Sequence, residues 1–245
     1  MKLKTLDKPA ETVTAPSGQA LAAIGLCAGY GAIPVLHDLE IQVAPGEIVA
    51  LLGPNGAGKT TTLLTLAGEV KPSAGHVFIG GQAAAGSLHR RTRQGLAFVP
   101  DERGVFARLS VKDNLRLGKV GPAKVFSYAP EIETRGATRA GLLSGGEQQL
   151  LAVARAIARK PQVLMIDEMS LGLSPKVVNR LVGLLREAAQ DGVAVLIVEQ
   201  HIHVALNAAE RAYILSRGSI VHHGSTAELL ESPEILDKFY LAQRD

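Results

Sequence analysis

A glycine-rich segment in the first third of the chain has the residue types and the spacing of a phosphate-binding loop. Glycines accept positive φ angles, so successive backbone N–H groups can converge on phosphate oxygens at the positive end of a following helix. An ordinary glycine-rich turn is the alternative, but an apolar strand-like stretch before the segment and a helix-like stretch after it favour phosphate binding. The nine residues are Gly53, Pro54, Asn55, Gly56, Ala57, Gly58, Lys59, Thr60 and Thr61.

Two polar side chains of this loop predict a nucleotide together with its metal ion. The ammonium group of Lys59 is expected to reach the β- and γ-phosphates. The hydroxyl group of Thr60 is expected to ligate Mg²⁺. The sequence therefore predicts a purine nucleoside triphosphate with Mg²⁺ as the ligand.

A pair of acids, Asp167 and Glu168, ends the stretch QVLMIDE. Asp167 ends this predicted strand, and after a phosphate loop such an acid is expected to hold Mg²⁺ or its water shell. Glu168 is the better candidate to orient or deprotonate an attacking water, because alternate residues of extended chain face opposite sides. Two adjacent surface acids with no chemical role are the alternative reading.

Three hydrogen-bonding side chains, Glu199, Gln200 and His201, follow another apolar stretch, residues 193–198. That stretch has the composition of a parallel strand buried on both faces. Ligands of open α/β sheets bind at the carboxyl ends of such strands. Residue types alone leave open which of the three side chains contacts a ligand.

A second potential anion site lies in the segment LLSGGEQQ, which starts at Leu142. Ser144 and Glu147 have the spacing of a capping box, and Gly145 and Gly146 between them expose backbone N–H groups at a helix N-terminus. An unrelated capped helix is the alternative.

Alternating strand and helix patterns position these groups and predict an α/β fold. Residues 1–20 lack apolar periodicity and are expected to form a flexible extension. Antiparallel strands are expected between Leu21 and Val49, a hairpin about Arg217 and Gly218, and helices from residue 225 onward. The region 101–143 is less periodic, and a helix is expected over 145–159.

Composition limits the classes of function. No stretch of the 245 residues is apolar enough to span a membrane or to act as a signal peptide, which predicts a cytoplasmic protein. Cys27 is the only cysteine, which excludes an internal disulfide and favours a buried thiol. The net charge of +3 comes without a Lys/Arg block, so no nucleic-acid partner is expected.

The order of the motifs resembles that of the ATP-binding-cassette (ABC) ATPases, with Leu-Ser-Gly-Gly-Glu-Gln-Gln between the phosphate loop and Asp167. The resemblance implies an ABC ATPase domain over 21–245: a P-loop NTPase (RecA-like) core, an N-terminal antiparallel β subdomain, and a helical signature subdomain inserted at about 104–156. It also implies that two cassettes dimerise head to tail, so that residues 144–147 of one clamp the γ-phosphate of ATP bound to the other. Tyr30 occupies the place of an aromatic residue that stacks on adenine.

Within that family, four segments are similar to the cassettes of branched-chain amino-acid importers. They are FVPDERGVFARLSVKDNL, DEMSLGLSP, VEQ and RAYILSRGSIVHHG. Closely similar cassettes serve importers of urea and of other amide or carboxylate solutes. The implied partners are a second ABC ATPase subunit, transmembrane permease subunits and, indirectly, a solute-binding protein. The implied location is the inner face of the cell membrane, as a peripheral subunit.

Three positions depart from the common family pattern, and the helical insertion is shorter than usual. Asp101 stands where most cassettes place a Mg²⁺-ligating Gln, and an acid can still ligate the ion. Met169 replaces a Pro, and Ser174 replaces an Asp in the loop that crosses the dimer interface.

The resemblance aligns the family's switch histidine with Gln200 and not with His201. The amide of Gln200 can donate a hydrogen bond to phosphate but cannot titrate. His201 is expected to start the next helix, with a local shift toward the nucleotide as the alternative.

Two other functions fit the sequence less well. A non-transport cassette would carry a second cassette or a long coiled coil, and a P-loop kinase or GTPase would lack the segment Leu-Ser-Gly-Gly-Glu-Gln-Gln.

Overall fold

The computed structural model describes residues 13–232 and residue 234. The first part of the predicted flexible extension, residues 1–12, lies outside these residues, as does most of the predicted C-terminal helical segment. Within the described part, Ala20 is already buried, and its backbone N–H donates to the carbonyl oxygen of Val43 at 2.9 Å. Ordered pairing with the first sheet thus begins just before β1 (Leu21–Tyr30).

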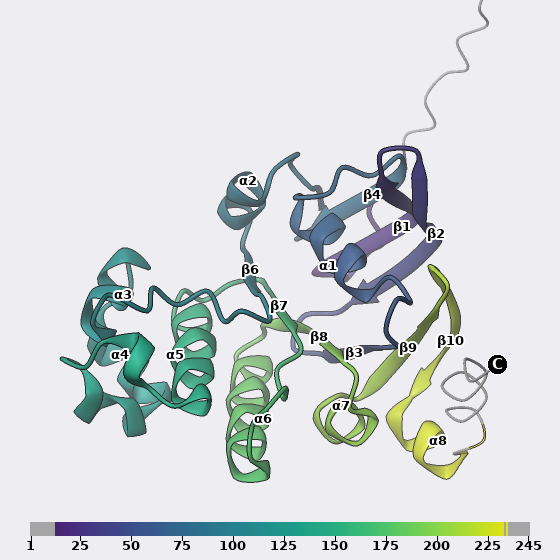
Figure 1. Ribbon diagram of the computed structural model, residues 1–245. Coiled ribbons are helices and arrows are strands. Elements are labelled where there is room, and N and C mark those ends of the chain that lie inside the picture. The colour runs from purple at the N-terminus through teal and green to yellow at the C-terminus, as the bar shows by residue number, and fades with distance from the viewer. Residues whose placement is uncertain (1–12, 233, 235–245) are drawn as a thin grey trace, which may run out of the picture.

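Two sheets form the framework (Figure 1). A four-stranded antiparallel sheet has the order β2-β1-β4-β5, and a six-stranded sheet has the order β10-β9-β3-β8-β7-β6. In the larger sheet β9, β3, β8, β7 and β6 are parallel, and β10 closes the edge as an antiparallel hairpin with β9. The strands after β1 are β2 (Ile33–Val43), β3 (Ile48–Leu52), β4 (Ala74–Ile79), β5 (Gln82–Ala83), β6 (Leu96–Val99), β7 (Val163–Asp167), β8 (Ala194–Glu199), β9 (Arg211–Ser216) and β10 (Ser219–Ser225).

Helices cover both faces of the larger sheet. Figure 1 shows α1 on the side of the antiparallel sheet, α6 and α7 on the opposite side, and α3, α4 and α5 gathered at one end of the molecule. The helices are α1 (Lys59–Ala67), α2 (Leu88–Arg93), α3 (Val111–Leu117), α4 (Pro122–Tyr128), η1 (Pro130–Arg135), η2 (Ala140–Leu142), α5 (Gly145–Ile157), α6 (Pro175–Gln190), α7 (Ile202–Ala208) and α8 (Thr226–Glu231).

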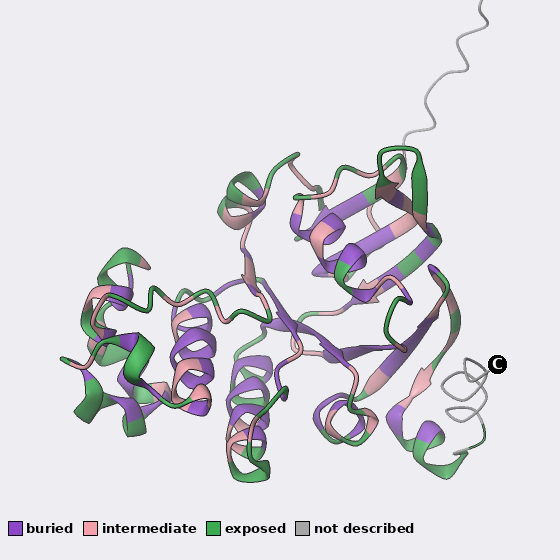
Figure 2. Cartoon of the chain, in the orientation of Figure 1, coloured by how far each residue is buried: buried purple, intermediate pink, exposed green. Residues whose placement is uncertain are grey.

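The central strands are buried on both faces, as their continuous apolar sequences predict (Figure 2). In β3, Ile48, Ala50 and Leu52 pack into the core with α5, α6 and α7. Val49 and Leu51 face the other way, into the core shared with α1 and the antiparallel sheet. A sheet held between two apolar layers has little freedom to move, so its strand ends form a rigid base for a site.

Three details differ from the sequence-based expectations. The region 101–143 contains four short helical elements, whose lengths of three to seven residues are too small to produce a clear helical period. Helix α5 ends at Ile157, short of the expected residue 159. Cys27 is half-buried, because it lies between the buried Leu26 and Ala28 and so points to the opposite face of β1.

None of the helices in the described part of the chain combines the length and the apolar character needed to cross a lipid bilayer.

Candidate functional site

Three neighbouring parallel strands bring the phosphate loop and the strand-end acids to one edge of the larger sheet. The phosphate loop follows β3, Asp167 ends β7 and Glu199 ends β8, and these strands are adjacent in the order β3-β8-β7. Their carboxyl ends therefore meet, as they do at the ligand-binding edge of open α/β sheets.

The phosphate loop turns through two glycines with left-handed backbone angles, Gly56 at φ 78° and Gly58 at φ 107°. Gly58 precedes the first turn of α1, and no side chain caps that helix end. The close approach of the loop to β9 also requires a glycine at position 53, since a Cβ atom there would lie 2.4 Å from the carbonyl oxygen of Leu215. The N–H groups at the start of α1 thus remain available to an anion.

Lys59 is buried within this loop, 6% exposed. Its Nζ donates to the carbonyl oxygens of Gly53 at 2.8 Å and Pro54 at 3.1 Å. Burial lowers the pKa of Lys59, and the negative charges of Glu168 and Asp167 oppose that shift. The loop thus holds a cation next to the carboxylates, at the positive end of a helix.

Asp167 is a buried acid, 4% exposed, and its Oδ1 has no hydrogen-bond partner among the described residues. Burial, together with the nearby carboxylates of Glu168 and Asp101, raises its pKa to about 6. A buried carboxylate oxygen without a donor, with other acids beside it, is suited to a divalent cation. Thr60 and Asp101 are both exposed, so their oxygen atoms are open to a ligand. The residues present therefore fit Mg²⁺.

Glu168 has an unusual backbone conformation, with φ at 43°. Its N–H donates to the carbonyl oxygen of Val198 in β8 at 2.9 Å. Its Oε1 accepts a hydrogen bond from Nε2 of Gln200. Glu168 and Gln200, which the sequence analysis predicted as site residues at the ends of two different strands, are thus in direct contact.

The other two members of the strand-end group contact Ser170. Glu199, 1% exposed, accepts hydrogen bonds from both the N–H and the Oγ of Ser170, each at 2.9 Å. His201, which precedes α7, places its Nδ1 3.0 Å from the same Oγ. Sequence reasoning did not find this cluster. The available signal was a carboxylate inside an apolar strand end, which requires buried donors.

Tyr30 is half exposed at the end of β1, and its hydroxyl group lies 3.5 Å from Oγ1 of Thr61 in the first turn of α1. The aromatic ring thus lies beside the phosphate loop and is partly open to solvent. Its predicted stacking role toward adenine remains a prediction.

Residues 144–147 lie apart from the phosphate loop. Ser144 and Glu147 form the predicted capping box: Oγ of Ser144 accepts from the Glu147 N–H at 3.3 Å, and Oε2 of Glu147 accepts from the Ser144 N–H at 2.8 Å. Gly146 packs against Val177 of α6, which leaves no space for a Cβ atom, and Gly145 lies beside Arg103. None of the side-chain hydrogen bonds among the described residues joins this helix end to residues 53–61.

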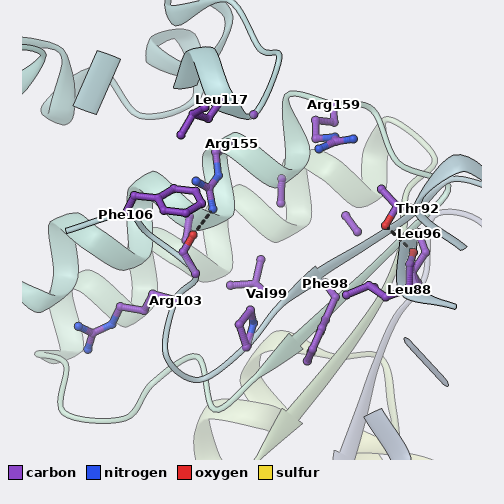
Figure 3. Close-up of a pocket in the computed structure, with 16 residues that line it drawn as sticks. Leu88, Thr92, Leu96, Phe98, Val99, Arg103, Phe106, Leu117, Arg155 and Arg159 are labelled. Atoms are coloured by element: carbon purple, nitrogen blue, oxygen red, sulfur yellow. Dashed lines mark hydrogen bonds between the residues drawn. The ribbon is translucent and has the colours of Figure 1, made fainter. Parts of the chain in front are cut away.

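A groove of about 440 Å³ separates the end of β6 from the helices α3 and α5 (Figure 3). Phe106 and Leu117 line it, although both are more than half exposed. Arg155 lies beside Phe106 (Figure 3) and donates to the carbonyl oxygen of Gly104 at 2.6 Å. An apolar lining with arginines at its wall is typical of a surface that binds another polypeptide.

Comparison with known proteins identifies the family to which this site belongs. Residues 36–170 match the family model "ABC transporter". The ATP-binding protein BraG of high-affinity branched-chain amino acid transport, from Pseudomonas aeruginosa, is 41% identical over 86% of this chain and 94% of its own length. A probable branched-chain amino acid transport ATP-binding protein, LivF of Archaeoglobus fulgidus, is 35% identical, covering 86% of this chain and 94% of its own.

An exporter subunit is also similar. The lipopolysaccharide export ATP-binding protein LptB of Escherichia coli is 34% identical over 91% of this chain and 97% of its own length. Among solved structures, an ATP-binding cassette in its ADP conformation superposes with a TM-score of 0.80 at 21% identity, covering 89% of this chain and 97% of that one. A cassette dimer bound to ADP and phosphate superposes with a TM-score of 0.73 at 25% identity, covering 84% and 98%.

These matches extend over both sheets and the helical end, and the RecA-like parallel sheet with its N-terminal antiparallel sheet is the cassette fold. ATP binding follows from the family, whose cassettes dimerise and associate with permease subunits. The chain belongs to the ABC transporter family, as its ATP-binding, ATP-hydrolysing subunit.

Proposed function

We propose that this ATPase drives an importer of branched-chain amino acids, or of a related amide or carboxylate solute such as urea. The observation that carries the proposal is the similarity to the P. aeruginosa branched-chain amino acid transport protein over nearly its full length. In this proposal ATP closes a dimer of cassettes, hydrolysis reopens it, and a separate permease converts the closure into alternating access. A solute-binding protein delivers the cargo, and the subunit works at the inner face of the membrane.

The proposed hydrolytic site consists of residues that the strand ends bring together. Thr60, Asp101 and Asp167 would hold Mg²⁺, which would neutralise phosphate charge during transfer. Glu168 orients or deprotonates the attacking water, and Gln200 holds the Glu168 carboxylate and contacts the γ-phosphate. The contact between the Gln200 amide and the Glu168 carboxylate supports this division of roles.

The second half of the nucleotide site comes from another cassette. We assign the clamp on the γ-phosphate to residues 144–147 of the second copy, because this helix end, whose Ser144 is exposed, shares among the described residues no side-chain hydrogen bond with the phosphate loop of its own chain. Leu142 and Leu171 are exposed apolar side chains, 77% and 54% exposed; Leu142 starts the segment LLSGGEQQ, and Leu171 lies in the proposed interface loop, residues 170–174. Burial of such side chains favours a dimer.

The groove between β6 and the inserted helices is the proposed docking surface for the permease. It offers apolar side chains, Phe106 and Leu117, at an open face, with arginines at its wall. A short amphipathic segment that carries an acidic residue would match both features.

Phe106→Ala should therefore reduce co-purification with the permease, whereas Leu230→Ala, at a similarly exposed leucine outside the groove, should not.

Deletion of the gene tests the cargo assignment. Uptake of radiolabelled leucine, isoleucine and valine by intact cells should fall, and the wild-type chain should restore it while Glu168→Gln should not. Glu168→Gln should reduce ATP turnover to a small residual rate and keep ATP bound, because the water is no longer activated while the charges that bind phosphate remain. Hydrolysis at the parent rate would contradict the catalytic assignment.

The similarity to the lipopolysaccharide export protein favours a second candidate, export of a lipid-linked polysaccharide. The same deletion separates the two. Unchanged amino-acid and urea uptake, combined with accumulation of lipopolysaccharide in the inner membrane, would reject import in favour of export.

A further inference from the structure

The backbone of Glu168 is held in a conformation that its own residue type disfavours. A non-glycine residue at φ 43° costs about 1–3 kcal/mol and persists only where surrounding contacts enforce it. Its N–H bond to Val198 ties one side of the residue to β8. A second contact on the other side is required to prevent the segment from relaxing.

That second contact is the bidentate bond between Ser170 and Glu199. Both residues are almost fully buried, at 6% and 1% exposure. The two oxygens of Glu199 each take one donor of Ser170, the N–H and the hydroxyl, both at 2.9 Å. Because Ser170 lies two residues after Glu168, this contact holds the following segment against the end of β8 just as the Val198 bond holds the preceding one.

The number of hydrogens available to the cluster indicates whether His201 donates or accepts its hydrogen bond. The hydroxyl group of Ser170 has one hydrogen, which it donates to Oε2 of Glu199 when that acid is ionised. His201 Nδ1, 3.0 Å from the same oxygen, must then be the donor. With Glu199 ionised, the imidazole carries its hydrogen on Nδ1 and fills one of the two acceptor positions of the serine hydroxyl.

We propose that Glu199 is a positioning residue, which through Ser170 holds Glu168 in the left-handed backbone conformation needed for hydrolysis. This inference rests on the proposed role of Glu168. Residues 199 to 201 then divide by the alternation of extended chain: Gln200 holds the Glu168 side chain, and its two neighbours hold the segment that carries it. Release of Ser170 should thus lower the rate of hydrolysis without lowering the affinity for ATP.

Glu199→Gln is the first test, because it keeps the size of the side chain and removes one acceptor. The expected result is a decrease in kcat of about tenfold, with the Kd for ATP unchanged within about twofold. Glu187→Gln is the matched control, since this acid is exposed on α6 and should leave both quantities unchanged. An unchanged kcat in Glu199→Gln would overturn the proposal.

Two further measurements separate a positioning role from a general structural one. Ser170→Ala should also lower kcat, and the double variant with Glu199→Gln should lose no more than the larger single loss, because both remove one contact. Added losses would contradict a shared contact. If Glu199→Gln fails to fold, as judged by circular dichroism, Ser170→Ala alone decides, and an unchanged kcat there overturns the proposal.

The dependence on Glu168 is tested in the Glu168→Gln background. There Glu199→Gln should produce no further decrease in the residual rate of hydrolysis, since its effect passes through residue 168. A further tenfold decrease would place Glu199 on another path and reject the proposal. If Glu168→Gln itself hydrolyses ATP at the parent rate, the proposed function fails instead, so the two failures are distinguishable.

Discussion

Two helices of the molecule, α1 and α5, begin at glycine-containing N-termini, but the two N-termini are capped differently. Helix α1 begins after Gly58 with no side-chain cap and no acid in its first turn. Helix α5 begins after Ser144 with a complete capping box, in which Glu147 supplies the reciprocal bond. The first helix end leaves its N–H groups to a ligand, whereas the second satisfies part of its own.

The carboxylates at the two helix ends differ in the same way. Asp167, near the start of α1, is buried and short of donors, and its pKa is raised to about 6. Glu147, in the first turn of α5, has a pKa below its usual value, chiefly because it accepts the backbone N–H of Ser144. Asp167 is thus available to bind a cation, whereas Glu147 already stabilises the start of α5. The contrast supports the proposed roles, in which the α1 end binds nucleotide within one chain and the α5 end contributes through a second chain.

The largest expected effect is at the open helix end. Lys59→Ala should weaken ATP binding by about 4 kcal/mol, roughly a thousandfold, because a buried cation that contacts phosphate is lost. Calorimetric titration with Mg-ATP measures this change. Lys71→Ala, at an exposed lysine just beyond α1, is the control and should bind ATP as the parent does. Unchanged affinity in Lys59→Ala would contradict the phosphate-loop assignment.

The next effect concerns pH. Because the folded pKa of Asp167, about 6, exceeds its ordinary value of 3.8, the folded state binds this proton more tightly than the unfolded state does. Its contribution should therefore lower the free energy of unfolding by about 3 kcal/mol as pH rises from about 4 to above 6, without Mg²⁺. Urea unfolding of the parent and of Asp167→Asn across this range isolates the contribution.

The contribution of Glu147 to the free energy of unfolding should depend on pH in the opposite direction. Its folded pKa is lowered, so its contribution to stability is present above its ordinary pKa and is lost as pH falls through the folded value. The difference between the parent and Glu147→Gln should thus shrink toward acid. A parallel trend for the two acids would contradict the contrast drawn between them.

The smallest effect is at the capped helix end. Ser144→Ala should lower the free energy of unfolding by about 1 kcal/mol, through loss of the cap, and leave ATP affinity of the monomer unchanged. Ser225→Ala removes the equivalent capping box of α8 and should cost a similar amount. Only Ser144→Ala should also lower the ATPase rate of the dimer. Equal ATPase rates in the two variants would remove the reason to separate the signature from an ordinary cap.

Much of the fold was predictable because its signals are local. The β3–α1 transition, the Gly68 end of α1 and the β9–β10 hairpin each depend on a few consecutive residues. The helical elements between 101 and 143 were missed as individual helices, because each is too short to repeat an apolar face and is stabilised by packing against α5. The capping box of α5 was predicted correctly, although it is exposed, because both of its partners lie within one turn.

The sequence by itself determined which residues form the candidate phosphate loop, which acids follow which strands, and which family they indicate. Those patterns are short-range, and each strand end presents its side chains in alternation whatever lies beside it. Only the tertiary structure decided what the strand-end acids contact. Glu199 and Ser170 are far apart in sequence and meet because β7 and β8 pair in a fixed register, which buries the carboxylate and requires donors from the neighbouring loop. Burial and pairing of distant segments depend on the whole fold, and the positioning of Glu168 depends on them.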